Sequence, residues 1–284
     1  KSFIFILFKL IWGKISHIIF KLYMNATISS INYCPVKSVS FQMIESCKIK
    51  KNIGIIGDRV FAFAKNLDLE QAKLFEKNPD ERKGKWNKIL TLKNSPALNK
   101  YNFLFKDQKL TLTLKDQEIL TIDINQLSER EALSKKIIEL ENFLEQPIVL
   151  MQNNQFPFFD TSISNKVDFV NSVSLLNVQS INDFEKKTNK KIEASIFRGN
   201  ICIDGIKPWK EREWIGKIIK INNVSFKVEK NIPRCVAINL KPQTDVNYFN
   251  LLQSLKKTYN HFDMGIYLTA LDEGKIEVGN KLEC

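Results

Sequence analysis

Two neighbouring stretches decide the expected fold: FRGNICIDGIKPWKEREWIG, residues 197–216, and IPRCVAINLKPQT, residues 232–244. Each holds a short apolar run, residues 201–203 and residues 236–240, bounded by glycine, proline and charged residues. Runs of this length between turn-forming residues are typical of short β-strands. Both stretches therefore predict strands joined by tight turns rather than long helices.

The rest of the chain continues this pattern. Further short strands are predicted at residues 26–33, 59–64, 85–92, 102–105, 109–114, 119–122, 217–221, 224–229, 266–271 and 275–278. Apolar and polar residues alternate strictly in residues 110–114, so one face of that strand is buried. Helical spacing predicts helices at residues 127–143, 174–188 and 248–259. Many short strands with few helices predict a mainly β protein of the α+β class with a barrel-like domain.

The length of 284 residues allows one large domain or two of ordinary size. Residues 152–166 are rich in Asn, Phe, Ser and Pro without periodicity, which is typical of a linker. We therefore predict one domain at residues 24–150 and a second at residues 165–284. Hydrophobic residues make up 44% of the chain, enough for a sizeable core.

The chain is basic, with 43 Lys and Arg against 31 Asp and Glu and a net charge of +12. Only six of the basic residues are arginine, the residue that phosphate clamping and base readout favour. Lysines and acids are interspersed, so a compositional bias towards lysine explains the charge. We expect no nucleic-acid partner, and a polyanion-binding face is the alternative.

The five cysteines include no CxxC pair, and their number is odd. They are Cys34, Cys47, Cys202, Cys235 and Cys284. A chain of this length needs no disulfides for stability, so a reducing compartment, the cytoplasm, is expected. The spacing also excludes a ferredoxin-type iron–sulfur cluster, which needs closely grouped thiolates.

Residues 1–23 are strongly apolar but are interrupted by Lys9, Lys14 and Lys21. The apolar runs are shorter than the ~20 residues that span a bilayer. Three interpretations stay open: an interfacial membrane anchor, an irregular signal anchor, or sequence upstream of a natural start at Met24. Membrane contact is expected only through this segment.

Cys235 lies between Arg234 and an apolar run. A neighbouring cation favours the thiolate, which is the form that binds metals. A thiolate is also a soft ligand suited to a thiophilic metal. The alternative is an ordinary buried cysteine.

The two stretches at residues 197–216 and 232–244 contain motifs whose order resembles that of the molybdenum cofactor sulfurase C-terminal (MOSC) family. The FRxN segment at residues 197–200, the acid-Trp turn at residues 211–214 and the RC pair at residues 234–235 carry the resemblance. The end of the chain, MGIYLTALDEGKIEVGNKLE at residues 264–283, also looks like that family. Upstream, YCPVKS (33–38) and GDRVFAF (57–63) are similar to its N-terminal domain. The resemblance implies a barrel-like MOSC domain with a smaller N-terminal β-barrel domain.

The resemblance also implies a cofactor, the molybdenum cofactor (Mo-molybdopterin), with Cys235 as its metal ligand. The cofactor is an anion with a flat hydrogen-bonding ring, so cations, hydroxyls and amides should surround it. The implied cofactor-binding residues are Lys37, Ser38, Arg59, Ser174, Arg198, Asn200 and Arg234.

Local structure is expected to present three of these residues to the cofactor. Arg198 and Asn200 are two residues apart, so they should lie on the same face of a strand. Ser174 should precede a helix, either to receive an anion at the helix N-terminus or as a plain N-cap. Glu211, in the acid-Trp turn, is expected to be catalytic as a proton donor, and a surface salt bridge to Arg212 or Lys210 is the alternative.

By this resemblance the chain is an oxidoreductase, similar to amidoxime reducing components and their bacterial relatives. The implied reaction removes oxygen from an N-hydroxylated small molecule, with electrons from a separate ferredoxin- or cytochrome-type protein. The alternative is a non-redox carrier of sulfur or molybdenum cofactor. A pyridoxal-phosphate desulfurase half is not found in this sequence, so the reaction is expected to be independent of pyridoxal phosphate.

Overall fold

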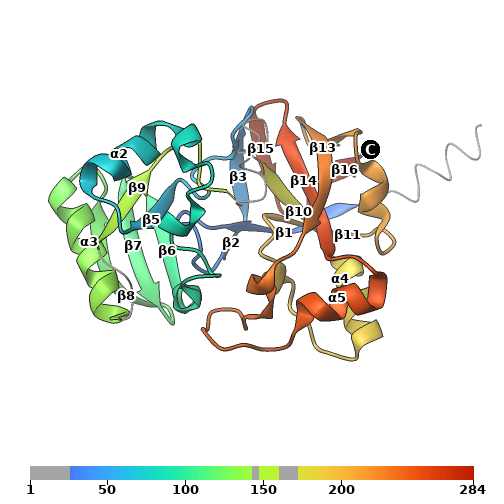
Figure 1. Cartoon of the computed structure of the whole chain (residues 1–284). Coiled ribbons are helices and arrows are strands. Elements are labelled where there is room, and N and C mark those ends of the chain that lie inside the picture. Colours follow the sequence, from blue (N-terminus) through green and yellow to red (C-terminus); the bar gives the residue numbers. More distant parts are fainter. Residues whose placement is uncertain (1–25, 143–146, 160–171) are drawn as a thin grey trace, which may run out of the picture.

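The computed structural model describes residues 26–142, 147–159 and 172–284 and arranges them in two lobes side by side (Figure 1). The N-terminal lobe contains strands β5 to β9 with helices α2 and α3. The C-terminal lobe contains strands β10 to β16 with helices α4 and α5, and strands β1 to β4 from the start of the chain join it. Residues 1–23, for which we predict an anchor or upstream sequence, lie outside the described residues.

An eight-stranded sheet forms the centre of the C-terminal lobe, in the order β16-β12-β13-β14-β10-β11-β1-β2. Its strands are β1 (Thr27–Tyr33), β2 (Gln42–Ile44), β10 (Val173–Asn177), β11 (Ile201–Asp204), β12 (Ile218–Ile221), β13 (Val224–Pro233), β14 (Asp263–Ala270) and β16 (Leu282–Glu283). Strand β15 (Gly274–Glu277) pairs with β3 (Ser46–Lys50), which pairs with β4 (Gly54–Ile55). Helices α4 (Val178–Thr188) and α5 (Leu251–Tyr259) pack below the sheet in the view of Figure 1.

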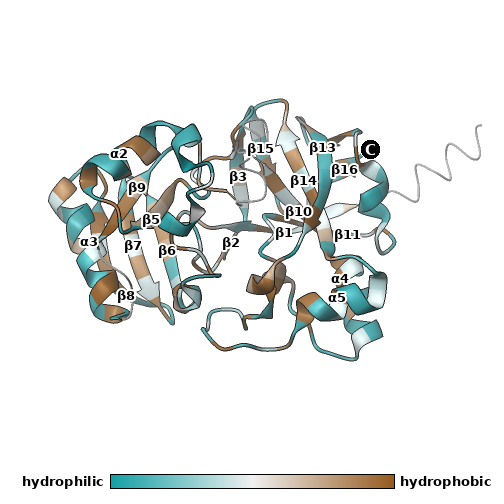
Figure 2. Cartoon of the chain, in the orientation of Figure 1, coloured by the Kyte–Doolittle hydropathy of each residue, from teal (hydrophilic) through white to brown (hydrophobic). Residues whose placement is uncertain are grey.

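The N-terminal lobe combines a two-stranded and a three-stranded antiparallel sheet. Strand β5 (Phe61–Lys65) pairs with β9 (Ile148–Gln152), and β6 (Tyr101–Lys106), β7 (Lys109–Leu114) and β8 (Gln117–Asp123) form a meander. Helices α2 (Leu69–Lys77) and α3 (Leu127–Leu140) cover its outer side (Figure 1). Figure 2 shows apolar and polar segments alternating along both helices, as expected when one helix face is buried.

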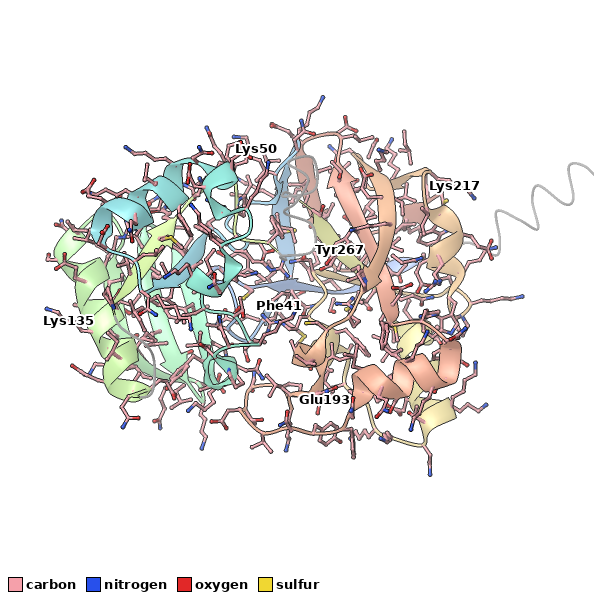
Figure 3. All side chains as sticks on the ribbon, viewed as in Figure 1. Phe41, Lys50, Lys135, Glu193, Lys217 and Tyr267 are labelled. Atoms are coloured by element: carbon pink, nitrogen blue, oxygen red, sulfur yellow. The ribbon has the colours of Figure 1, made fainter. Side chains whose placement is uncertain are left out.

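Strands from the start of the chain connect the lobes. Strand β1 pairs with β11, and β3 pairs with β15, so the first strands add to the C-terminal sheet. The chain then crosses to the N-terminal lobe, where Val36 forms a bridge with Phe61. In the other direction, the buried Asn99 donates from Nδ2 to the carbonyls of Lys241 (3.0 Å) and Thr244 (2.8 Å). Figure 3 shows Phe41 and Tyr267 at this seam between the lobes.

The predicted class, mainly β within α+β, is confirmed. A closed barrel stays a prediction, because the strand order of the described residues is an open row from β16 to β2. The division into domains at residues 24–150 and 165–284 also stays a prediction.

Two predicted strands are short 3₁₀ turns instead. Residues 86–88 and residues 236–239 form the 3₁₀ helices η2 (Trp86–Lys88) and η7 (Val236–Asn239). The apolar run at η7 predicted burial correctly for Ile238, but short apolar runs do not distinguish a strand from a helical turn.

The predicted helix at residues 174–188 is wrong over its first four residues. Its first residues belong to β10, which lies between β11 and β14, and the helix begins at Val178. Leu175 and Leu176 are buried because a central strand is covered on both faces, and that gives a continuous apolar run. The N-cap is Asn177, whose side chain accepts from the backbone N–H of Gln179 at 3.0 Å.

No helix in the described part of the chain is long and apolar enough to cross a membrane.

Candidate functional site

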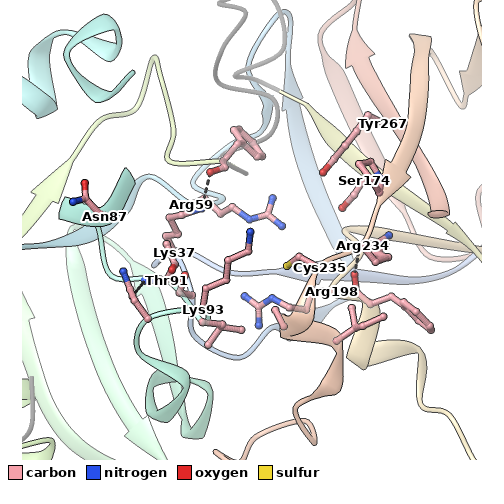
Figure 4. A pocket seen from close by; sticks show the side chains of 18 residues that line it. Lys37, Arg59, Asn87, Thr91, Lys93, Ser174, Arg198, Arg234, Cys235 and Tyr267 are labelled. Carbon is pink, nitrogen blue, oxygen red and sulfur yellow. Dashed lines mark hydrogen bonds between the residues drawn. The ribbon is translucent and has the colours of Figure 1, made fainter. Parts of the chain in front are cut away.

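A cavity of about 480 Å³ lies at the seam between the lobes (Figure 4). This volume is in the range of small-molecule and cofactor sites. The residues around it are Lys37, Ser38, Arg59, Asn87, Thr91, Leu92, Lys93, Asn94, Phe159, Ser174, Phe197, Arg198, Pro233, Arg234, Cys235, Ala237, Ile238 and Tyr267. Seven of the nine predicted site residues are among them: Lys37, Ser38, Arg59, Ser174, Arg198, Arg234 and Cys235.

The lining is strongly cationic. It includes two lysines and three arginines, and no Asp or Glu is among the lining residues that the structure describes. Figure 4 shows Lys37, Arg59 and Lys93 on one side of the pocket, with Arg198, Arg234 and Cys235 on the other. A pocket with this charge favours an anionic ligand.

A tight turn directs Arg59 into the pocket. Its backbone is left-handed (φ 53°), directly after Gly57 (φ 85°) and Asp58. The guanidinium Nη1 of Arg59 donates to the buried Asp58 Oδ2 at 3.0 Å and lies 3.4 Å from Asn200 Oδ1. Burial raises the pKa of the Asp58 carboxyl above its ordinary value, and Arg59 opposes that shift. Asp58 therefore fixes the direction of the Arg59 side chain.

Asn200 lies beneath the pocket, is fully buried and is not a lining residue. Its amide Nδ2 donates to Asp58 Oδ2 at 3.0 Å, and its Oδ1 accepts from the hydroxyl of Ser174 at 2.8 Å. Asn200 thus joins the N-terminal turn to β10 of the C-terminal lobe. Ser174 is a strand residue, so neither the helix N-terminus nor the N-cap that we predicted for it applies.

Arg198 is in a turn and not on a strand, because its backbone is left-handed (φ 51°, ψ 43°) and β11 begins at Ile201. The expected alternation of Arg198 and Asn200 along a strand is therefore wrong. The guanidinium carbon of Arg198 lies 4.7 Å from the centre of the Phe41 ring. Burial lowers the pKa of Arg198, and the charges that Cys34 and Cys235 would carry as thiolates oppose this. Negative charge at Cys235 would therefore favour the charged form of Arg198.

Arg234 binds backbone carbonyls. Its Nε donates to the carbonyl oxygen of Met264 at 2.8 Å, and its Nη1 donates to that of Phe197 at 2.7 Å. Gly265 (φ 81°) follows Met264, and a Cβ there would lie 2.4 Å from the Leu175 carbonyl oxygen. Only glycine therefore allows this close approach of β14 to β10. Arg234 anchors the turn that carries Cys235 and adds positive charge to the pocket.

Lys37 and Ser38 come from the segment that crosses between the lobes. Both are buried, and the ammonium of Lys37 donates to the Phe159 carbonyl oxygen at 2.6 Å. Ser38 has a left-handed backbone (φ 69°), so the chain reverses direction at this point. That reversal places both side chains in the pocket wall.

Cys235 is the one cysteine among the lining residues that the structure describes. It is partly exposed, whereas Cys34, Cys47 and Cys202 are buried. Its backbone is extended (φ −123°, ψ 179°), two residues after the end of β13 and directly before the turn of η7. Within the described residues no group of three or more His, Cys, Asp or Glu could hold a metal ion.

Glu211 lies away from the pocket lining and is fully buried. Its Oε2 accepts from Asn177 Nδ2 at 2.8 Å, and its Oε1 accepts from Ser180 Oγ at 2.8 Å. Burial raises the pKa of Glu211. A surface salt bridge is excluded, and the catalytic role that we predicted has no support from this position.

Sequence reasoning missed three features of the pocket. Asp58 and Phe41 were not among the predicted site residues, and the segment from Asn87 to Asn94 was predicted to be largely a strand. The one available signal was the Asp-Arg pair within GDRVFAF, because a buried arginine needs an acceptor.

Comparison with known proteins finds a family model that matches the C-terminal part of the chain. Residues 166–283 match the model of the MOSC domain. Over 140 residues, 45% of this chain, the sequence is 26% identical to "Mitochondrial amidoxime reducing component 2" of Bos taurus, and the match spans 41% of that relative's length.

Solved structures were also found. YiiM from Geobacillus stearothermophilus is 19% identical, with a TM-score of 0.31, over 39% of this chain and 52% of that one. The YUAD protein from Bacillus subtilis is 10% identical, with a TM-score of 0.43, over 92% and 95% of the two chains. Residues 166–283 of this chain thus match the MOSC domain model, and the FRxN, acid-Trp and RC motifs lie in order within those bounds.

Proposed function

We propose that the pocket binds the molybdenum cofactor through Cys235 and that the chain reduces N-hydroxylated small molecules. The observation that carries the proposal is one partly exposed thiol in a cavity lined by five cations and, among the described residues, by no carboxylate. The name of the Bos taurus relative, an amidoxime reducing component, supports this class of substrate.

The donor set of the pocket fits the cofactor. An anion with a phosphate group needs charge-assisted donors, and Lys37, Arg59 and Arg198 provide them in the pocket wall. Ser38 adds a hydroxyl, and Cys235 provides the soft ligand that a thiophilic metal prefers. These residues would hold the cofactor, and Arg234 would add positive charge from behind Cys235.

The residues beneath the pocket position this donor set. Asp58 and Asn200 connect Arg59 to Ser174 through buried hydrogen bonds, so donors from the two lobes keep a fixed separation. Such preorganised donors need little reorganisation when an anion binds. Phe41 packs against both Arg59 and Arg198, at 5.0 and 4.7 Å from its ring centre, and limits their movement.

When bound, the cofactor supplies two-electron chemistry that removes the hydroxyl oxygen from nitrogen. The overall balance is R–NHOH plus two electrons and two protons, giving R–NH₂ and water. The electrons come from a separate protein of the ferredoxin or cytochrome class, in keeping with our expectation from the sequence.

The test uses the full chain purified from cells supplied with molybdate. Molybdenum per protein is measured by elemental analysis, and turnover is measured with benzamidoxime and an artificial electron donor. Cys235→Ser should lose metal–thiolate character and turnover, because a hydroxyl is a hard ligand that is poorly ionised at neutral pH. Cys284→Ser is the matched control, since that exposed cysteine is not in the pocket, and should behave like wild type.

Two results would contradict the proposal. Wild-type protein without molybdenum would remove the cofactor assignment, as would X-ray absorption with the same number of sulfur ligands in wild type and Cys235→Ser. Stoichiometric molybdenum without turnover of any N-hydroxylated probe would favour the carrier role instead.

A further inference from the structure

The pocket wall opposite Cys235 is formed by a turn of the N-terminal lobe. Asn94 stabilises this turn: its Oδ1 accepts from the backbone N–H of Thr91 at 2.7 Å, and its Nδ2 donates to the Ile89 carbonyl oxygen at 3.0 Å. Leu92 is buried in the core of the lobe, and the exposed Lys93 that follows it lines the pocket. The turn therefore presents Lys93 at the pocket from a fixed backbone.

Lys93 differs from the other four cations of the lining. Arg59 is paired with Asp58, and Lys37 and Arg234 donate to backbone carbonyls. Arg198 stacks on Phe41. For the ammonium of Lys93, the described part of the chain holds no hydrogen-bond or ion-pair partner. It is the exposed cation at the rim of the cavity, whereas Lys37 is 9% exposed.

This arrangement separates two kinds of cation. Four cations, Lys37, Arg59, Arg198 and Arg234, contact protein groups and come from both sides of the pocket, where they would hold the proposed cofactor. Lys93 lies on the side of the cavity that faces Cys235, and Thr91 and Asn87 line the cavity near it (Figure 4). An unpaired rim cation attracts an anion as it enters, and it can form a charge-assisted hydrogen bond once the anion is bound.

We propose that Lys93 determines substrate specificity by binding a carboxylate or phosphate on the end of the substrate remote from its N–O bond. The chain then prefers anionic N-hydroxylated compounds to neutral ones of the same shape. This inference rests on the proposed function and adds the substrate class to it.

The experiment compares two probes of nearly the same shape, benzamidoxime and 4-carboxybenzamidoxime, with wild type, Lys93→Gln, Lys93→Arg and Lys77→Gln. Lys77 is the matched control, an exposed lysine outside the pocket. Lys93→Gln should raise the KM of the carboxylate probe about five- to tenfold at low salt, in the range of a partly exposed charge pair. The KM of benzamidoxime should change by less than about twofold. Lys93→Arg should remain close to wild type, and added salt should reduce the difference.

A second measurement does not need turnover. Titration calorimetry of the carboxylate probe should show the same five- to tenfold weakening in Lys93→Gln, with molybdenum content unchanged. Equal changes for both probes, or no change, would overturn the inference. A fall in molybdenum content in Lys93→Gln would also overturn it, because the lysine would then hold the cofactor. If molybdenum-loaded wild type reduces neither probe, the proposed function fails, and the calorimetry still decides whether Lys93 selects anions.

Discussion

In four places of the chain a carboxylate residue is followed by arginine, and two of these places, Asp58-Arg59 and Glu211-Arg212, differ instructively in structure. Asp58 and Glu211 are both buried, with 1% and 0% of the residue exposed, and burial raises the pKa of both. Asp58 pairs with the next residue, Arg59, at 3.0 Å. Glu211 does not pair with the next residue, because Arg212 bonds Asp263 at 3.3 Å instead.

Backbone conformation explains the difference. Arg59 has a left-handed backbone (φ 53°), which turns its guanidinium back towards Asp58. Glu211 and Arg212 are successive residues of the 3₁₀ helix η6 (Lys210–Trp214), where consecutive side chains point about 120° apart. Neutral groups of Asn177 and Ser180 therefore satisfy Glu211. The first carboxylate orients a pocket cation, and the second fastens η6 to the start of α4.

The largest expected effect comes from placing a second carboxylate beside each of these acids. Asn177→Asp creates an uncompensated buried like-charge pair with Glu211, and Asn200→Asp does the same at Asp58 with Arg59 nearby. We expect losses in the free energy of unfolding of about 4 kcal/mol for Asn177→Asp and about 2 kcal/mol for Asn200→Asp at neutral pH. Denaturant unfolding measures both.

Asn222→Asp, at an exposed turn, is the control and should change stability by less than about 0.5 kcal/mol. If Asn177→Asp does not fold at neutral pH, circular dichroism at pH 5 should show recovery, because protonation removes the repulsion. An equal or larger loss in Asn200→Asp would show that Arg59 does not compensate charge at Asp58.

Removing each arginine should give the next largest difference in the free energy of unfolding between the two places. Arg59→Gln leaves the buried Asp58 without its cation and should cost about 3 kcal/mol. Arg212→Gln breaks a pair whose side chains are 27% and 23% exposed and should cost less than about 1 kcal/mol. Denaturant midpoints with unchanged slopes check both values. Similar losses in the two variants would mean that the two acid-arginine pairs are equivalent after all.

The sequence predicted much of the fold because its signals were local. Strand β7 was predicted with the observed bounds, since strict alternation over Lys109–Leu114 needs no tertiary information. Residues 174–177 of strand β10 were predicted as helix, because a central strand has no alternation and its neighbours β11 and β14 come later in the chain. Helix α2 was missed, although its capping box at Asp68 and Gln71 is a local signal.

The sequence predicted which residues form the candidate site better than it predicted how those residues are arranged. Motif resemblance placed Cys235, Arg59 and Arg198 in one site, and all three line the pocket. The resemblance could not separate Glu211 from that set, because the acid-Trp turn matches the family in sequence, whereas no residue of η6 lines the pocket. Asp58 could not be recognised as a partner of Asn200, since the two meet only when β1 pairs with β11.

The change of stability with pH is expected to be a smaller effect than the losses caused by the substitutions above. A carboxyl whose pKa is higher in the folded protein than in the unfolded chain binds its proton more tightly in the folded protein. It therefore stabilises the fold at low pH, and this stabilisation is lost as pH rises through the folded-state pKa. Both Asp58 and Glu211 have raised pKa values, so wild type should lose this contribution as pH rises above the ordinary carboxyl range of about 4. Glu211→Gln cannot titrate there. Its stability relative to wild type should therefore increase as pH rises above that range, as measured by denaturation at each pH.

Asp58→Asn should show a smaller increase than Glu211→Gln. Burial is the largest influence on the pKa of Asp58, and the opposing charge of Arg59 is the second largest. Glu211 instead accepts hydrogen bonds from neutral groups. A flat pH profile for Glu211→Gln relative to wild type would mean that Glu211 titrates as an ordinary carboxyl. A larger increase in Asp58→Asn would place Arg59 away from Asp58 in solution.

The smallest expected effect separates the two pairs by their response to salt. At 1 M NaCl the Debye length is about 3 Å, so an ion pair open to solvent is largely screened. The loss caused by Arg212→Gln, less than about 1 kcal/mol at low salt, should disappear when mutant and wild type are compared at 1 M NaCl. The loss caused by Arg59→Gln should persist, because Asp58 is 1% exposed and counterions cannot reach it. Comparison at equal salt cancels the general effect of salt on folding. If the Arg59→Gln loss also vanished, solvent would reach the carboxylate of Asp58, and the pocket arginine would lack the buried anchor that holds it in place for an anion.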